Sequence, residues 1–242
     1  MINVVVPMAG QGSRFQAGGY SDPKPFIDVL GKTMIERVLE NLAVDESRFI
    51  LIVRNEHYIK YTEVFKRIEN EYDVTIVFSE KLTEGACCSV LKAIDYINNQ
   101  TPLLIANSDQ IVETNLNLFL RDCFERNLDG SILTFYDNDP KWSYAALNND
   151  STIRIVREKE VISPHATVGI YFYSRGIDFV HDAVKMVANN DRVNNEFYVC
   201  PVYNYGIEGG RKFGIFEIAK ESMHGLGIPG DLKTYITYLE SR

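Results

Sequence analysis

The sequence predicts an α/β fold in which a mixed, mostly parallel sheet is flanked by helices within a single domain. Short apolar runs rich in β-branched residues, the first of them Ile2–Val6, are typical of buried strands. Amphipathic segments with helical spacing separate these runs in the first half of the chain, and this alternation gives parallel strands joined by right-handed crossovers. The length of 242 residues, 45% of them hydrophobic, suits one α/β domain built from two tightly joined halves.

The first 112 residues carry the clearer alternation. Thr33 can cap a helix, and Val90, Ala93 and Ile97 share one face of another. Strands are therefore expected at 2–6, 49–53, 74–78 and 103–106, and helices at 34–42, 56–70 and 89–97. This Rossmann-like order places the carboxyl ends of the strands along one edge of the sheet, where ligands bind.

The pattern of the second half is less regular. Asn148–Asp150 favours a hairpin between two strands. No linker or internal repeat separates the halves, so the second half is expected to extend the same sheet. Strands are expected at 131–136, 144–147, 153–157, 166–173 and 212–218, and helices at 116–126, 176–188 and 231–240.

Composition excludes several classes of protein. The net charge of −8 argues against general nucleic-acid binding, which needs a basic surface. The four cysteines show no zinc spacing and suit a reducing cytoplasm, which is the expected location. The four histidines lack the partner spacing of a metal or catalytic pair. Neither a signal peptide nor a membrane-spanning run is expected.

The loop after the first strand is suited to bind phosphate. Gly10 and Gly12 let the backbone turn sharply and expose N–H groups, which form an anion-binding nest. Arg14 adds a fork of donors, and Lys24, between two prolines, adds a point charge. A dinucleotide fingerprint would need glycine at Phe15, and the P-loop pattern also lacks a glycine. The remaining alternative is a plain turn with solvated charges.

Three motifs in this region, G-x-G-S-R-F, D-P-K-P-F and L-G-K-T-M-I-E, resemble those of the sugar-nucleotide pyrophosphorylases, nucleotidyltransferases with a GT-A-like fold. The resemblance implies a nucleotide-binding half at 1–112 and an acceptor-binding half at 113–242. Arg14 and Lys24 would be the catalytic cations. The opening loop would hold a nucleoside triphosphate through Met8, Ala9, Gly10, Gly12, Ser13 and Arg14.

Two further groups follow predicted strands. Gly85 and Ala86 resemble the family's small-residue site for the nucleotide base, and Glu84 and Ser108 are assigned to the nucleotide beside them. Asp109 follows the strand 103–106, where a carboxylate is a natural ligand for Mg²⁺, and the resemblance gives it the catalytic metal. The alternatives are a helix N-terminus at 83–86 and an aspartate that only serves a turn.

The resemblance places the acceptor in the second half. Glu158 and Lys159 resemble the family's Glu-Lys pair, with the lysine near the acceptor's phosphate. Gly169 lies in a strand similar to the family's Asn-Ala-Gly-Ile-Tyr strand, where the acceptor packs, and Glu196 lies in a segment whose glutamate binds acceptor hydroxyls. Taken alone, the Glu-Lys pair is an ordinary solvated charge cluster and the segment before Glu196 is a turn.

One position departs from the family pattern. The family often has a second metal-binding aspartate before a G-T-P-x-D-L stretch, and Gly225 stands at that position here. Asp231 is the remaining candidate for a second metal ligand. The alternative is that Asp231 only caps the last helix.

The predicted function is therefore nucleotidyl transfer. An acceptor phosphate attacks the α-phosphorus of a nucleoside triphosphate, with CTP favoured, and pyrophosphate leaves. The expected acceptor is a small phosphorylated precursor of a capsule or surface polysaccharide, such as phosphoglutamine, phosphocholine or glycerol phosphate. No nucleic acid or membrane is expected as a partner, and a homodimer is left open.

Three alternatives remain. The first is a uridylyl-, thymidylyl- or guanylyltransferase acting on a sugar 1-phosphate. The second is a glycosyltransferase of the GT-A type, whose D-x-D metal motif is matched formally by Asp137–Asp139. The third is a nucleotide sensor without catalytic activity.

Overall fold

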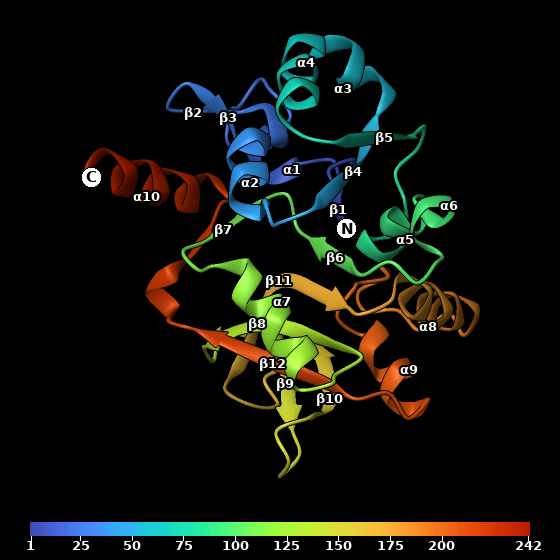
Figure 1. Ribbon diagram of the computed structural model, residues 1–242. Helices are drawn as coiled ribbons and strands as arrows, with labels where there is room; N and C mark the ends of the chain where they lie inside the picture. Colours follow the sequence, from blue (N-terminus) through green and yellow to red (C-terminus); the bar gives the residue numbers. More distant parts are fainter.

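The computed structural model describes residues 1–242, and its centre is a nine-stranded mixed sheet (Figure 1). The strands of the first half pair in parallel, and the second half joins them through antiparallel pairing of β11 with β6. The predicted α/β fold is confirmed. Along the sheet the order is β10 (Ile153–Glu158), β9 (Ser143–Leu147), β11 (His165–Tyr173), β6 (Leu103–Ala106), β1 (Ile2–Pro7), β4 (Ser47–Arg54) and β5 (Val74–Ser79), while β8 (Gly130–Tyr136) pairs with β11 and β12 (Phe213–Ile218).

Two hydrophobic cores, one on each face, bury this sheet between helices. The larger core includes side chains of α2 (Met34–Leu42), α4 (Thr62–Glu71), α7 (Leu116–Glu125) and α10 (Pro229–Glu240). The smaller includes side chains of α5 (Ala86–Leu91), α6 (Ile94–Ile97), α8 (Gly176–Ala188) and α9 (Val202–Glu208). The remaining elements are α1 (Ser13–Ala17), η1 (Lys24–Phe26), β2 (Asp28–Val29), β3 (Lys32–Thr33), α3 (Asn55–Lys60), β7 (Gln110–Val112), η2 (Lys220–Ser222) and β13 (Met223–Gly225).

Strand β1 shows why the centre of the opening run is apolar. Val4 and Val6 lie in the larger core, Val5 lies in the smaller one, and all three are fully buried. Burying one such side chain contributes about 1.5–3 kcal/mol. With apolar residues required on both faces, the strand holds one polar side chain, that of Asn3 near its start, which is buried and hydrogen-bonded to Arg48 and to the carbonyl of Tyr96. Polar groups free to bind a ligand are therefore placed beyond the end of the strand.

Two predicted helices are each divided in the structure. The segment expected as one helix at 56–70 forms α3 and α4, which meet at Tyr61. The Tyr61 ring stacks on Phe26 with centroids 4.0 Å apart, and its hydroxyl donates to Asp22 over 2.6 Å. The segment expected at 89–97 forms α5 and α6, and α5 begins earlier than predicted, at Ala86. The helical spacing of apolar residues continues across both helix breaks, so this periodicity alone did not reveal them.

A short pair of strands that the sequence did not reveal brings the end of the chain back to the sheet edge. Strand β13 pairs antiparallel with β7, and Gly225 lies opposite Gln110. Just beyond, the N–H of Leu226 donates to the carbonyl of Asp109 over 2.7 Å. Residues 225–231 therefore lie beside the carboxyl end of β6.

The cysteines are free thiols, and three of the four are buried. Burial raises the pKa of Cys123 to about 12, so its thiol packs in the core as an apolar group instead of reacting. None of the helices combines the length and the apolar character needed to cross a membrane.

Gly85 joins the two halves through a close backbone contact. Its φ of +119° is suited to glycine, and a Cβ there would lie 2.4 Å from the carbonyl oxygen of Phe197. On either side, the N–H of Phe197 donates to the main-chain carbonyl of Glu84 over 2.7 Å, and the N–H of Cys87 donates to the carbonyl of Phe197 over 2.9 Å. The close approach that Gly85 allows is therefore that of the Phe197 main chain.

Gly85→Ala is expected to lower the free energy of unfolding by about 1–3 kcal/mol, because the methyl group meets main-chain atoms at a positive φ. Gly230→Ala is the control, since a Cβ there meets nothing within 4 Å. It should change stability by no more than about 0.5 kcal/mol. Urea unfolding measures both values, and equal stability of the two variants would contradict the contact at Gly85.

Candidate active site

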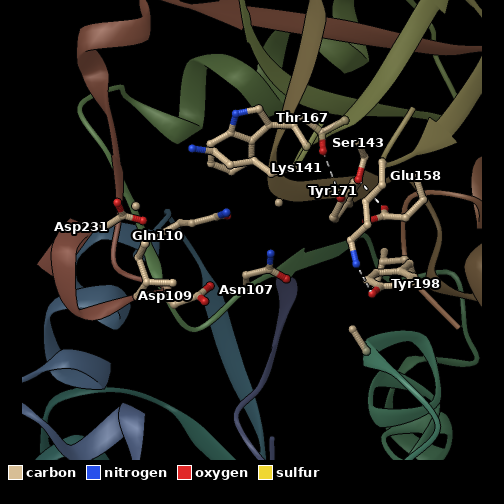
Figure 2. A pocket seen from close by; sticks show the side chains of 18 of the residues that line it. Asn107, Asp109, Gln110, Lys141, Ser143, Glu158, Thr167, Tyr171, Tyr198 and Asp231 are labelled. Carbon is tan, nitrogen blue, oxygen red and sulfur yellow. Dashed lines mark hydrogen bonds between the residues drawn. The ribbon is translucent and has the colours of Figure 1, made fainter. Parts of the chain in front are cut away.

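Two adjoining cavities open at the carboxyl ends of β1 and β6. The first, called the loop cavity, has a volume of about 490 Å³ and is lined by the opening loop, Lys24 and four residues after β5, namely Leu82, Thr83, Gly85 and Ala86. The second, called the sheet cavity, measures about 580 Å³ and is lined largely by residues of the second half (Figure 2). Both are lined by Ala86, Asn107 and Asp109, so the cavities meet at these residues.

The opening loop is held against the Lys24 segment. Gly12 has a φ of +63° and precedes α1, and a Cβ at Gly12 would lie 3.3 Å from the Cβ of Lys24. Glycine is therefore needed both for the left-handed turn and for the packing. Gly10, Gln11, Gly12 and Ser13 all line the loop cavity.

Lys24 and Asp109 form an ion pair at the junction of the cavities. The Lys24 ammonium donates to Asp109 Oδ2 over 2.7 Å, and each side chain is about one-fifth exposed (21% and 22%). The pair joins η1 to the end of β6. A phosphate that binds Lys24 would have to displace Asp109 from it, and a cation that binds Asp109 would have to displace Lys24.

Arg14 is an unengaged cation at the same site. It is exposed on α1 and its guanidinium makes no hydrogen bond or ion pair within the chain. It lines the sheet cavity, whereas the rest of the opening loop lines the loop cavity. Five donors are therefore available to an anion at the boundary of the two spaces.

Asp231 lies in the first turn of α10 and also lines the sheet cavity. It does not cap the helix, because Ile228 is the N-cap residue and no side-chain cap is formed; the alternative role as a cap is therefore wrong. A Cβ on Gly225 would lie 3.4 Å from Asp231 Oδ2, and one on Gly227 would lie 3.1 Å from Asp109 Oδ2. These two glycines leave room for two carboxylates to enter the same cavity.

No three His, Cys, Asp or Glu side chains are grouped as metal ligands. Two carboxylates in one solvent-reached cavity nevertheless fit Mg²⁺, which takes one or two protein carboxylates and completes its shell with water and phosphate oxygens. The donor set at Asp109 and Asp231 is therefore chemically compatible with that ion.

The far wall of the sheet cavity carries a polar cluster built on β9, β10 and β11. The Ser143 hydroxyl donates to Glu158, and Lys159 donates to the Tyr198 hydroxyl over 2.6 Å (Figure 2). The Lys159 ammonium also lies 4.6 Å from the centroid of the Tyr198 ring. Burial raises the pKa of Glu158 above its ordinary value, although the bond from Ser143 and the charge of Lys159 act in the opposite direction.

Several predicted residues lie elsewhere than expected. The Met8 side chain is buried in the larger core and its N–H donates to Ile52 over 3.0 Å, so neither group is free for a ligand. Glu84 lines neither cavity and pairs with Arg192. Glu196, expected beside the acceptor, lines the loop cavity.

The other predicted residues do reach the site. Ala9, Gly85 and Ser108 line the loop cavity, and Glu158, Lys159 and Gly169 line the sheet cavity. The side chains of Asn107 and Gln110 occupy the space that a Cβ atom on Gly169 would take. Which of these residues touch a substrate remains a prediction.

Further lining residues were given no role from the sequence, although Asn107 and Gln110 were expected at this edge of the sheet; these residues include Gln11, Asn107, Gln110, Trp142 and Tyr198. Gln11 lies between Gly10 and Gly12, and Asn107 directly follows a buried strand, so the sequence pattern indicated that both lie near the site. Tyr198 ends the segment that was singled out for Glu196, so the sequence pattern indicated its position too. Trp142 comes from a segment without a motif, and only the fold brings it to the cavity.

The formal D-x-D motif lies outside both cavities. Asp137 accepts the N–H groups of Asn138 and Asp139 and pairs with Lys220 over 2.9 Å. Asp139 pairs with Lys141 over 3.3 Å. These contacts give the motif a turn-forming role.

Comparisons with known proteins show which family the chain belongs to. Residues 4–201 match the nucleotidyl transferase family. The chain is 23% identical over 237 residues to a 2-C-methyl-D-erythritol 4-phosphate cytidylyltransferase of Thermosipho africanus, covering 94% of this chain and 97% of that protein. It is 27% identical over 210 residues to a 2-aminoethylphosphonate cytidylyltransferase of Lancefieldella rimae, covering 80% and 79%.

The fold is similar to that of a solved nucleoside-diphosphate-sugar pyrophosphorylase from Vibrio cholerae, with a TM-score of 0.82 and 23% identity over 97% of this chain and 99% of that one. The family match alone spans far more than half of the sequence. The chain therefore belongs to the nucleotidyl transferase family and is a nucleotidyltransferase.

Proposed function

We propose that this enzyme joins CTP to a small phosphorylated acceptor and releases pyrophosphate. The observation that carries the proposal is the meeting of two cavities at Asn107 and Asp109, beside Lys24. The loop cavity would hold the nucleoside triphosphate and the sheet cavity would hold the acceptor. In-line transfer needs two phosphates to meet at one point, and the junction provides it.

The cations have separate roles in this proposal. Arg14, which has no partner within the chain, would neutralise the charge of the leaving pyrophosphate. Lys24 would leave Asp109 and contact both the α-phosphate and the attacking phosphate. Catalysis by positioning and charge neutralisation needs no general base, because the acceptor phosphate is already an anion.

Mg²⁺ would be held by Asp109 together with Asp231. The ion would neutralise negative charge on the phosphates as the transfer proceeds. Asp231 would supply from the helix α10 the carboxylate that is missing at Gly225, since its Oδ2 reaches the space beside that glycine. The pairing of β13 with β7 holds this segment beside Asp109.

The acceptor's body would contact Glu158, Ser143 and Lys159. CTP is favoured because both curated relatives described above are named cytidylyltransferases. The acceptor would be a small phosphorylated precursor of a surface polysaccharide, such as phosphoglutamine, phosphocholine or glycerol phosphate. A sugar 1-phosphate is the second candidate, and the pyrophosphorylase fold favours it.

A screen of pyrophosphate release tests the proposal. The four common ribonucleoside triphosphates and thymidine triphosphate are each combined with a panel of phosphorylated acceptors. Release is expected with CTP and a non-sugar acceptor, and Lys24→Ala should reduce it at least a hundredfold, a loss of about 2.7 kcal/mol in transition-state stabilisation. Release with no pair would reject the proposal, whereas release only with a sugar 1-phosphate would select the second candidate.

Asp109→Asn and Asp231→Asn are each expected to raise the Mg²⁺ concentration for half-maximal release about tenfold or more, because each removes a charged oxygen ligand. Asp45→Asn, an exposed aspartate outside both cavities, is the control. Binding of Mn²⁺ in the presence of nucleotide, measured by electron paramagnetic resonance, separates metal loss from other defects. Normal Mn²⁺ binding by Asp231→Asn would remove it from the metal site.

The raised pKa of Glu158 gives a pH prediction for the acceptor. Below this pKa the carboxyl is protonated and loses a charged hydrogen-bond acceptor, so the acceptor's KM should rise as pH falls through it. Glu158→Gln should raise KM about tenfold at pH 8 and remove this part of the pH dependence. Glu160→Gln, an exposed neighbour, is the control. Identical KM profiles for the two variants would contradict contact between Glu158 and the acceptor.

A further inference from the structure

We propose that Asn107 is a catalytic residue whose side-chain amide donates a hydrogen bond to a phosphate oxygen at the reacting centre. The assignment rests on the proposed nucleotidyl transfer between the loop cavity and the sheet cavity.

The backbone of Asn107 is rigidly placed. It directly follows β6, in which all four residues are buried. Its N–H donates to the carbonyl of Gly169 on β11 over 3.0 Å. Asn107 is thus held between a buried strand and the neighbouring strand of the sheet.

The side chain of Asn107 is free to bind a ligand. Its carboxamide makes no hydrogen bond within the chain, and the residue is partly exposed. Figure 2 shows it directed into the cavity, on the same side as Asp109. An amide with two donors and no partner, facing a polar cavity, is suited to bind oxygen atoms.

Gly169 provides the space for this side chain. A Cβ at Gly169 would lie 2.3 Å from Asn107 Nδ2 and 2.2 Å from Gln110 Oε1, and the φ of Gly169 is +90°. The two carboxamides therefore lie side by side over a residue that must be glycine. Gln110 Oε1 is buried without a partner, but Gln110 lines only the sheet cavity.

Elimination among the shared residues then selects Asn107. The two substrates can react only where the cavities meet, and the residues that line both are Ala86, Asn107 and Asp109. The Ala86 side chain has no polar atom, and the Asp109 carboxylate accepts from Lys24 and repels phosphate. Asn107 is the shared side chain that can donate to a phosphate oxygen.

The amide takes no part in bond making. An oxygen of the acceptor phosphate forms a bond to the α-phosphorus, and the bond from that phosphorus to the bridging oxygen breaks, with the electron pair leaving on pyrophosphate. Asn107 keeps both its protons throughout. A fixed neutral donor stabilises the charge that develops on the non-bridging oxygens without needing a change of its own ionisation.

Asn107→Leu keeps the approximate shape of the side chain and removes its hydrogen-bond donor. It is expected to lower kcat about a hundredfold while both KM values stay within about threefold, because a donor that acts mainly in the transition state affects kcat. Asn189→Leu, at the exposed C-cap residue of α8, is the control and should retain full kcat. Gly169→Ala should also lower kcat, because its methyl group displaces the amide.

The side-chain amide signal of Asn107 in a ¹⁵N–¹H spectrum, assigned by its loss in Asn107→Leu, gives an independent readout. It should shift when a non-hydrolysable CTP analogue and Mg²⁺ bind. Full kcat in Asn107→Leu, or an unmoved signal, would overturn the role of Asn107 while leaving nucleotidyl transfer intact. No pyrophosphate release by the unmodified chain would instead overturn the proposed function and this role with it.

Discussion

The burial of β1 and β6 on both faces is the constraint on which the site depends. Val5 of β1 and Leu104 of β6 are fully enclosed, and their neighbours along each strand enter the opposite core. A strand enclosed in this way leaves polar groups free for a ligand only beyond its end. The parallel pairing of β1 with β6 brings these ends to one edge, and the opening loop and Asp109 therefore meet there.

The same edge concentrates charge on a chain that is acidic overall. Lys24 and Asp109 neutralise each other at the junction, while Arg14 lies unpaired nearby. A site of this kind can receive phosphate without a basic surface, because a few cations placed at short range act more strongly than distant net charge. Glu158, on the far wall of the sheet cavity, is desolvated enough for its pKa to rise.

Much of the fold and part of the site could be predicted from local pattern. The strands showed as apolar runs, and the opening loop showed as two glycines with nearby cations, because each depends on residues close in sequence. The positions of Met8 and Glu84 could not be predicted in this way, because they depend on contacts with residues distant in sequence. Whether a loop residue turns into a core or out to a cavity depends on partners such as Ile52 and Arg192, which lie far away in the chain.

The α/β class, the glycine turn after the first strand and the position of Asp109 after a buried strand could all be predicted from local sequence, since strand periodicity and glycine turns are local properties of the backbone. Three features appear only in the folded chain: Gly85 contacts the Phe197 main chain, Asp231 lies beside Gly225 without capping α10, and Asn107 lies between two cavities. Each of these outcomes requires segments distant in the sequence to share one volume, and steric exclusion in that volume acts only once the chain has folded.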